Sequence, residues 1–343
     1  MNRSLSSTDC LIIGAGLAGL HAARELSRAG IETIVLEKGG TSGGRLATTA
    51  VHTEMGTAMA DEGAQYFTVR EATFEEEVRG WLRAGVAYPW SMGFVTPDGS
   101  AFPDGHPRYC GSGGMASIAE RLAAGLDVRL ESEVVAIAHE GAWLVTPAGG
   151  ERLEATALLL TAPVPQSLAL LAPGDIPLPA DEGAMLARIA YDPCLALTVV
   201  LNGPSQIPAP GGMWPGGERI YWMADNGQKG ISPVSCLTIH ATPEYSRALF
   251  AGERERIVEE LLAEAAPWLG SGPKAGVAAT RLRRWRYSIP LQLYPARCLL
   301  VDAPGMIAFA GDAFAGPRVE GAALSGMAAG QALIAALSTG DRR

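Results

Sequence analysis

The sequence predicts an α/β protein in which a nucleotide-binding domain of the Rossmann type is interrupted by a second domain of mixed or antiparallel β-sheet and helices. Three observations predict this class. Residues 9–37 combine a short apolar run, three spaced glycines, an amphipathic segment and a second apolar run that ends in an acid. Between residues 164 and 290, β-rich segments and prolines become more frequent. A strand that ends in Gly311 and Asp312 then returns to the first pattern.

The N-terminal fingerprint gives each of its glycines a task. Gly14 allows the chain to turn sharply out of a first strand at residues 10–13. Gly16 has no Cβ, so a pyrophosphate can approach the backbone, and Gly19 allows the next helix to pack closely on the sheet. The N-terminus of that helix directs N–H groups and a partial positive charge at the phosphates. We therefore expect dinucleotide contacts at Gly14, Gly16, Leu17, Ala18 and Gly19.

Glu37 closes the second apolar run. A carboxylate here can accept hydrogen bonds from both hydroxyls of an adenosine ribose, and its charge disfavours a 2′-phosphate. FAD and NAD both fit this part of the pattern better than NADP. The following residues 38–45 (KGGTSGGR) offer close backbone contact and an arginine that can reach a phosphate. They add Lys38, Gly43, Gly44 and Arg45 to the predicted cofactor-binding residues.

Composition excludes several classes of function. The chain has 343 residues, of which 48% are hydrophobic and 18% charged, as expected for a globular protein with a sizeable core. A net charge of −9 argues against nucleic-acid binding. Five scattered cysteines without a CxxC motif indicate reduced thiols in a cytoplasmic protein and no metal site. We interpret the apolar residues 321–337 as a buried helix, since they are too few and too polar for a membrane span.

Hydrophobic periodicity predicts the remaining elements. A strand near residue 128 is expected to join the parallel sheet, and the next ones to form an antiparallel meander across it. Helices are expected at residues 71–84, 116–124 and 244–265, and strands at 128–130, 134–137, 143–146, 158–163, 196–201, 220–223, 235–240, 276–285 and 307–312. The predicted nucleotide-binding domain comprises residues 1–75, 108–165 and 291–343, and the predicted substrate domain comprises 76–107 and 166–290.

Two further runs suit a cofactor with a planar ring. Residues 61–68 (DEGAQYFT) place small and amide side chains where a backbone can pass close to such a ring. Asp312 can bind a ribityl or ribose hydroxyl, and the following helix can aim N–H groups at the electron-rich edge of a reduced flavin. Residues 38–45 moreover resemble the GGxxGGR element that follows the ribose-binding acid in FAD-dependent oxidoreductases, and this resemblance favours FAD over NAD. The expected contacts of FAD include Gly63, Ala64, Gln65, Val134, Ala162, Gly311, Asp312, Arg318, Glu320, Gly321 and Ala322.

With these motifs in order, the chain resembles the renalase family of FAD-dependent oxidoreductases, within the amine oxidase superfamily. The resemblance also rests on GSGGM at 111–115, TAPVPQ at 161–166, TIHAT at 238–242, RRWRYSIP at 283–290 and GDAFAGPRVEGAALSG at 311–326. Pro317 interrupts the last motif, which can alter the start of the helix beside the flavin.

The resemblance implies a fold like that of p-hydroxybenzoate hydroxylase, with FAD bound non-covalently. It further implies oxidation of isomeric dihydronicotinamides, the 2- and 6-dihydro forms of NAD(P), to NAD(P)⁺. Hydride would pass to flavin N5, and O₂ would be reduced to hydrogen peroxide. Such a reaction depends on stacking and positioning more than on an acid or base, and the sequence has no obvious pair of nucleophile and base.

Five residues are the candidates for the catalytic site. Gln65 and Tyr66 are expected beside the ring, because their segment should pass it. His240 matches a family position near the flavin, and a satisfied core histidine explains it equally well. Trp222 and Tyr287 can wall an aromatic pocket, although packing in the core is the commoner role for such residues.

Two other functions stay open. In a flavin amine oxidase a lysine is usually bridged by water to flavin N5, and this chain has Lys38, Lys229 and Lys274. Lys38 adjoins Glu37 and Lys229 lies in a predicted turn, which leaves Lys274. The second alternative is an FAD-binding protein without turnover. For the enzyme, the expected partners are a dihydronicotinamide dinucleotide, whose phosphates the arginines of residues 281–286 can attract, and O₂. We expect a monomer or weak dimer without membrane or nucleic-acid partners.

Overall fold

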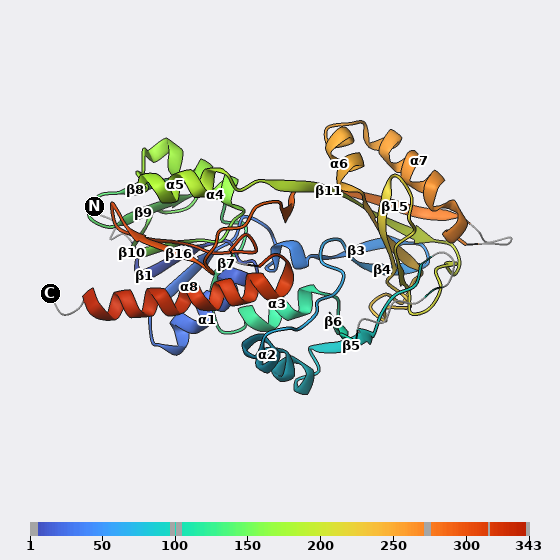
Figure 1. The fold of residues 1–343 in the computed structure, drawn as a ribbon, viewed down its shortest axis with the longest axis horizontal. Coiled ribbons are helices and arrows are strands. Elements are labelled where there is room, and N and C mark those ends of the chain that lie inside the picture. Colours follow the sequence, from blue (N-terminus) through green and yellow to red (C-terminus); the bar gives the residue numbers. More distant parts are fainter. Residues whose placement is uncertain (1–5, 97–99, 101–104, 271–275, 315, 341–343) are drawn as a thin grey trace. The chain divides into compact units, whose positions relative to one another are not determined.

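A computed structural model of the chain describes residues 6–96, 100, 105–270, 276–314 and 316–340. The chain divides into two compact units, whose elements are labelled in Figure 1. Unit 1 comprises Met1–Gly44, Ala119–Ala190 and Pro290–Arg343, and unit 2 comprises Arg45–Ile118 and Tyr191–Ile289.

Unit 1 is built on an eight-stranded sheet with the order β16-β17-β10-β1-β2-β7, to which β8 and β9 add beside β10. The parallel part consists of β1 (Ser6–Ile13), β2 (Thr33–Leu36), β7 (Asp127–Arg129), β10 (Leu153–Leu160) and β17 (Met306–Phe309). The strands β8 (Val134–His139), β9 (Trp143–Pro147) and β10 form the predicted antiparallel meander, and β16 (Leu299–Asp302) runs antiparallel to β17. These pairings confirm the predicted parallel sheet and the meander.

The helices of unit 1 include α1 (Leu17–Arg28), α4 (Val164–Leu171), α5 (Ala180–Ala187) and α8 (Arg318–Gly340), with a 3₁₀ turn at Ala172–Gly174. By length and composition, α8 is the one helix of the described chain that could cross a membrane. It packs closely against α1, since a Cβ at Gly326 would lie 2.1 Å from the carbonyl oxygen of Ala18.

Unit 2 contains a five-stranded sheet with the order β12-β13-β14-β11-β15. Its strands are β11 (Tyr191–Leu201), β12 (Gly212–Met213), β13 (Ile220–Asp225), β14 (Cys236–Ala241) and β15 (Val277–Pro290). Ile257 and Leu261 of α7 (Arg254–Ala265) are buried in the same apolar cluster as Leu197 and Ile239 of the sheet. The single helix predicted at 244–265 is wrong, since α6 (Pro243–Leu249) and α7 are separated by a turn at Gly252.

The rest of unit 2 comes from the first part of the chain. It holds a hairpin of β3 (Thr48–Thr53) and β4 (Gly56–Asp61), a pair of β5 (Ala87–Ser91) and β6 (Arg108–Gly111), and helix α2 (Ala72–Arg83). Short 3₁₀ turns lie at Gly44–Leu46 and Ala266–Trp268, and α3 (Ala116–Ala123) leads from unit 2 into unit 1.

The compact units and the predicted domains do not coincide. Residues 45–75 and 108–118, predicted for the nucleotide-binding domain, belong to unit 2, because Ala58 and Ala60 of β4 are buried with Val200 of β11 and Cys236 of β14. Conversely, residues 166–190 belong to unit 1.

Candidate active site

The turn between β1 and α1 has the conformation that its glycines predict. Gly14 has a φ of +107°, and a Cβ there would lie 2.7 Å from Thr161 Oγ1. A Cβ at Gly19 would lie 2.0 Å from the carbonyl oxygen of Gly14. At Gly16, by contrast, a Cβ would meet nothing within 4 Å. Packing therefore requires Gly14 and Gly19, whereas Gly16 leaves the space that an approaching pyrophosphate needs.

Glu37 is fixed by backbone donors on both of its carboxylate oxygens. Oε2 accepts a hydrogen bond from the N–H of Ala15 at 2.9 Å, and Oε1 accepts one from Gly39 at 2.8 Å. Each oxygen keeps a further lone pair for a ribose hydroxyl. Gly43 donates its N–H to the carbonyl of Ala15 at 2.8 Å, so the glycine-rich loop lies beside the fingerprint. These groups fit the ADP half of FAD. Of the other predicted contacts in this region, Lys38 is exposed, and the side chains of Leu17 and Ala18 are buried.

Unit 1 also contains the predicted contacts from the end of the chain. Gly311 has a φ of +148° and donates its N–H to Ser325 Oγ at 2.9 Å, and the neighbouring Asp312 is buried. Helix α8 begins at Arg318, directly after Pro317, with a φ of +79° in the left-handed region.

The first turn of helix α8 includes Glu320 and Gly321, and Ala322 follows them. A Cβ at Gly321 would lie 1.8 Å from the carbonyl oxygen of Gly316, so only glycine fits there. Of the two remaining predicted contacts, Ala162 follows β10, with its N–H group near Gly14, and Val134 is the buried first residue of β8.

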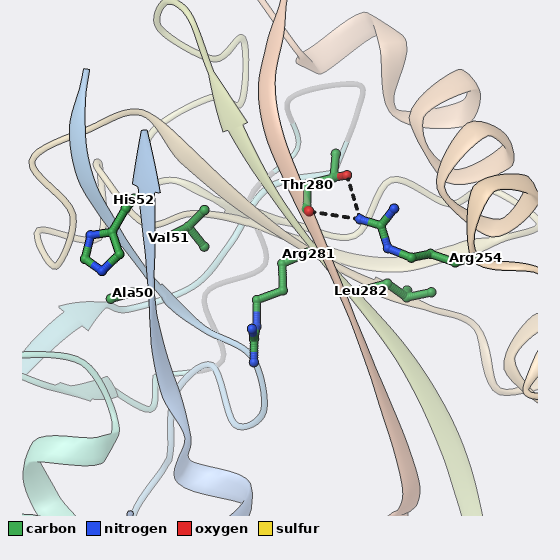
Figure 2. A pocket seen from close by; sticks show the side chains of 7 residues that line it. All are labelled: Ala50, Val51, His52, Arg254, Thr280, Arg281 and Leu282. Carbon is green, nitrogen blue, oxygen red and sulfur yellow. Dashed lines mark hydrogen bonds between the residues drawn. The ribbon is translucent and has the colours of Figure 1, made fainter. Parts of the chain in front are cut away.

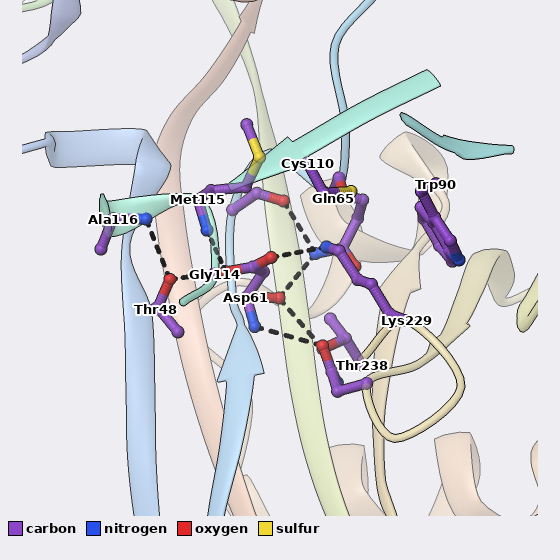
Figure 3. A network of polar contacts seen from close by, with 12 residues as sticks. Thr48, Asp61, Gln65, Trp90, Cys110, Gly114, Met115, Ala116, Lys229 and Thr238 are labelled. Carbon is purple, nitrogen blue, oxygen red and sulfur yellow. Dashed lines mark hydrogen bonds and ion pairs between the residues drawn. The ribbon is translucent and has the colours of Figure 1, made fainter. Parts of the chain in front are cut away.

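In unit 2, the segment 61–66 is organised around Asp61, whose side chain is fully buried (Figure 3). Its Oδ1 accepts hydrogen bonds from the hydroxyl of Thr48 at 2.5 Å and from the N–H of Met115 at 2.8 Å. Lys229 Nζ donates to Oδ2 at 2.5 Å. The carbonyl of Asp61 accepts from the Thr238 hydroxyl at 3.0 Å, and so the segment is tied to β3, β14 and the turn before α3.

Lys229 lies in a turn, but its side chain is buried. Its side chain has no exposed area, and its ammonium group lies 5.1 Å from the centre of the Trp90 ring. Sequence reasoning set Lys229 aside and kept Lys274, which lies outside the described residues. The turn itself was predicted correctly, but no local pattern indicates a carboxylate partner so distant in the chain.

Glu62 is held by three donors from the second sheet. Arg281 Nε donates to Glu62 Oε1 at 2.7 Å, and the carbonyl of Glu62 accepts from Trp285 Nε1 at 2.9 Å. His240 Nε2 lies 3.1 Å from the same carbonyl. Burial, with a smaller effect of the positive charge of Lys229, lowers the pKa of His240 to about 4. The imidazole is therefore neutral near pH 7, and its Nε2–H donates to the carbonyl.

The backbone of the segment lies against residues 45–47, and a Cβ at Gly63 would lie 2.1 Å from the carbonyl oxygen of Arg45. Ala64 donates its N–H to that carbonyl at 2.8 Å. The sequence predicted that Arg45 binds a phosphate. In the structure, its guanidinium instead donates to the carbonyl of Ser288 at 3.0 Å and lies 5.9 Å from the centre of the Tyr191 ring.

Tyr66 belongs to a cluster of aromatic rings. Its ring centre lies 5.2 Å from that of Phe94, 5.7 Å from that of Trp222 and 6.5 Å from that of Trp90. The structure thus brings together four of the five candidate residues, Gln65, Tyr66, Trp222 and His240, around one segment. Tyr287 lies elsewhere in unit 2, against Tyr191 at 5.7 Å between ring centres.

The arginines of β15 have separate environments. Arg281 lines a hollow of about 530 Å³ together with Ala50, Val51, His52, Arg254, Thr280 and Leu282 (Figure 2). Arg283 lies over the Trp285 ring at 4.7 Å, and Arg284 donates to the carbonyl of Gly252 at 2.8 Å. Arg286 lies 5.4 Å from the centre of the Phe250 ring. None of the five candidate catalytic residues lines the hollow.

Residues 70–334 match the family of flavin containing amine oxidoreductases. The chain belongs to this family. Residues 12–80 also match the NAD(P)-binding Rossmann-like domain. The protein is therefore an FAD-dependent oxidoreductase, and the predicted cofactor and fold class are confirmed.

Solved structures show the same fold. A putrescine oxidase A394C mutant is 16% identical, with a TM-score of 0.69 over 97% of this chain and 100% of the other. A candidate protoporphyrinogen oxidase from Exiguobacterium sp. 255-15 is 14% identical, with a TM-score of 0.68 over 97% of this chain and 99% of that one. Putrescine oxidase bound to putrescine is 18% identical, with a TM-score of 0.61 over 96% and 99%. At these identities the likeness concerns the fold.

Proposed function

We propose that this family member is a renalase-like oxidase of isomeric dihydronicotinamides, which converts the 2- or 6-dihydro form of NAD(P) to NAD(P)⁺. FAD, when bound, supplies the hydride acceptor at N5 and passes two electrons to O₂, which yields hydrogen peroxide. The proposal extends the family assignment by the sequence motifs at residues 61–68 and 311–326.

One observation carries the choice of substrate class. Both carboxylates of the segment 61–66 are neutralised within unit 2, Asp61 by Lys229 and Glu62 by Arg281. A cationic amine is usually bound through an uncompensated carboxylate or an aromatic cage. Because both acids are paired and His240 is neutral, the segment lacks the free carboxylate that would pair an ammonium group, and its aromatic rings are left to stack on an uncharged ring.

The proposed roles of the side chains are positioning roles. The cluster of Tyr66, Trp90 and Trp222 offers apolar surface for a flat ring, and Gln65 offers a polar contact at its border. His240 holds the carbonyl of Glu62 and exchanges no proton in the reaction. Hydride transfer needs such orientation, and it needs no general base at these positions.

Anaerobic stopped-flow mixing tests the proposal. When the FAD-loaded protein is mixed with an isomeric dihydronicotinamide, the absorbance of oxidised flavin at about 450 nm should be lost. Putrescine or a monoamine should leave the absorbance unchanged. If neither class bleaches fully bound FAD, the enzyme proposal for these substrates is wrong.

A flavin amine oxidase is the second candidate, supported by the family match and by the fold shared with the putrescine oxidases. Rapid bleaching by an amine, with none by the dihydronicotinamides, would establish it in place of our proposal. The same proposal includes a non-covalent cofactor, a cytoplasmic location and a monomer or weak dimer. Acid precipitation that releases all the flavin would support the first of these.

A further inference from the structure

The side-chain amide of Gln65 has a single chemically acceptable orientation. Its Nε2 lies 2.6 Å from the carbonyl oxygen of Asp61 and 3.1 Å from that of Gly63. Two carbonyl oxygens can only accept hydrogen bonds, so the group that faces them must be the NH₂. A rotated amide would set Oε1 against both oxygens. The orientation of the amide is therefore fixed by the backbone of its own segment.

This orientation leaves Gln65 Oε1 as a buried acceptor. The residue is 6% exposed, and Oε1 has no hydrogen-bond partner among the described residues. Buried acceptors without a donor are rare and destabilising, because the oxygen has lost its water without a replacement. The network around Asp61 keeps the amide in place, so the donor for Oε1 is either an ordered water or a molecule that binds beside the segment (Figure 3).

Trp222 supplies a buried group of the opposite kind. It is 3% exposed, and its Nε1–H has no acceptor among the described residues. Trp222 lies directly opposite His240 in the register of β13 and β14, and directly opposite side chains share one face of a sheet. His240 on that face contacts the carbonyl of Glu62, and the Trp222 ring contacts Tyr66. The unpaired donor and acceptor thus both border the segment 61–66.

We propose that Gln65 Oε1 and Trp222 Nε1 recognise the carboxamide of the nicotinamide ring, a specificity that rests on the proposed function. A primary carboxamide carries an N–H donor and a carbonyl acceptor, the complement of these two atoms. The amide N–H donates to Gln65 Oε1, and the amide oxygen accepts from Trp222 Nε1. The aromatic cluster beside Gln65 covers the ring that bears this group.

The experiment compares two substrates that differ in this donor. Anaerobic stopped-flow traces give an apparent Kd for 6-dihydro-NAD and for its 3-acetylpyridine analogue, whose acetyl group keeps the carbonyl oxygen and lacks the N–H. Dissociation constants are compared because the intrinsic reactivities of the two rings differ. The unmodified protein should bind the carboxamide about tenfold more tightly, as expected for one hydrogen bond to a buried group.

Two variants assign the two contacts. In Gln65→Met, which keeps the side-chain length, the preference should disappear because only the carboxamide loses a partner. In Trp222→Phe, both substrates should weaken to a similar degree because both carry the carbonyl. Gln206→Met, at an exposed glutamine of the same unit, should leave both constants unchanged.

Equal binding of the two substrates by the unmodified protein would overturn the proposal, and this comparison needs no variant to fold. A preference that survives in Gln65→Met would also overturn it, and a shifted flavin spectrum in that variant would then assign Oε1 to a flavin N–H. If no dihydronicotinamide bleaches the flavin at all, the proposed function fails first. The two failures are therefore distinguishable.

Discussion

Lys229 Nζ lies 2.5 Å from Asp61 Oδ2, and neither side chain has any exposed area. The pair joins the end of β4 to the turn after β13, two elements far apart in the sequence. Every polar atom of Asp61 has a hydrogen-bond partner. Its backbone N–H donates to Asn226 Oδ1 at 3.4 Å, in addition to the bonds of its carboxylate and carbonyl described above. A buried ion pair is a weak source of stability, but loss of one partner leaves an uncompensated charge. We therefore expect the network to tolerate removal of both charges better than removal of one.

Lys229→Met should lower the free energy of unfolding by about 3–5 kcal/mol, because the Asp61 carboxylate remains buried without its cation. Urea denaturation at pH 7.5 measures the change. Adding Asp61→Asn to Lys229→Met should recover part of the loss. The control is Arg79→Met, which breaks the exposed pair with Glu75 and should cost about 0.5 kcal/mol or less. Equal losses in the single and double variants would show that the charge on Asp61 is not the cause.

Alanine at Gly16 and at Gly19 should have opposite consequences. A Cβ at Gly19 would overlap the carbonyl of Gly14, so Gly19→Ala should destabilise or prevent folding of the protein without FAD. A Cβ at Gly16 meets open space, so Gly16→Ala should fold normally and lose affinity for FAD, by about tenfold or more if its methyl occupies the pyrophosphate position. Thermal unfolding of the apoprotein and titration with FAD separate the two effects. Normal FAD binding by Gly16→Ala would place the pyrophosphate elsewhere.

Glu37→Gln tests the ribose contact. The amide nitrogen of glutamine cannot accept from Ala15 or Gly39, so one of the two backbone donors loses its partner and the position for a ribose hydroxyl is disturbed. We expect FAD to bind about tenfold more weakly, since a charge-assisted hydrogen bond is lost. Fluorescence titration of the apoprotein measures the affinity, with the exposed Glu32→Gln as control. Unchanged affinity in Glu37→Gln would remove Glu37 from the site.

Local patterns predicted unit 1 more completely than unit 2, for a physical reason. The fingerprint and the strands of the parallel sheet depend on neighbouring residues: β1 ends at Ile13 as predicted, and β2 ends at Leu36, directly before Glu37. The β3–β4 hairpin was missed, because its residues alternate weakly and its burial comes from β11 and β14. The same holds for Asp61 and Lys229, whose pairing depends on tertiary contact. The sequence of residues 61–68 predicted that Gln65 lies beside a bound ring. That its Oε1 has no partner among the described residues depends on tertiary contacts, which only the structure shows.

Arg318→Gly should stabilise the protein by about 1 kcal/mol. Arg318 has a φ of +79° directly after Pro317, and a non-glycine residue in this region costs on the order of 1–3 kcal/mol. Glycine removes this strain at an entropic cost in the unfolded chain, which leaves a smaller net gain. Urea denaturation of the apoprotein measures stability, and FAD titration shows whether the arginine also contacts the cofactor. A loss of stability in the variant would indicate that contacts of the side chain outweigh the strain.

Stability should fall in mild acid because two histidines are held neutral. Burial lowers the pKa of His21 to about 3 and that of His240 to about 4, from an ordinary value of 6.5. Below pH 6.5 the unfolded chain binds protons at both positions while the folded protein does not, so the free energy of unfolding decreases as pH falls from 6.5 toward 4. Each group contributes a slope of up to about 1.4 kcal/mol per pH unit.

Urea denaturation of the FAD-loaded protein at several pH values between 5 and 7.5 measures this slope. His21→Leu should remove about half of the part due to these two histidines, since the leucine binds no proton in either state. His240→Leu should remove a similar share and should also loosen the segment 61–66, because the carbonyl of Glu62 loses a donor. A slope that is the same in both variants as in the unmodified protein would assign the acid sensitivity to other groups.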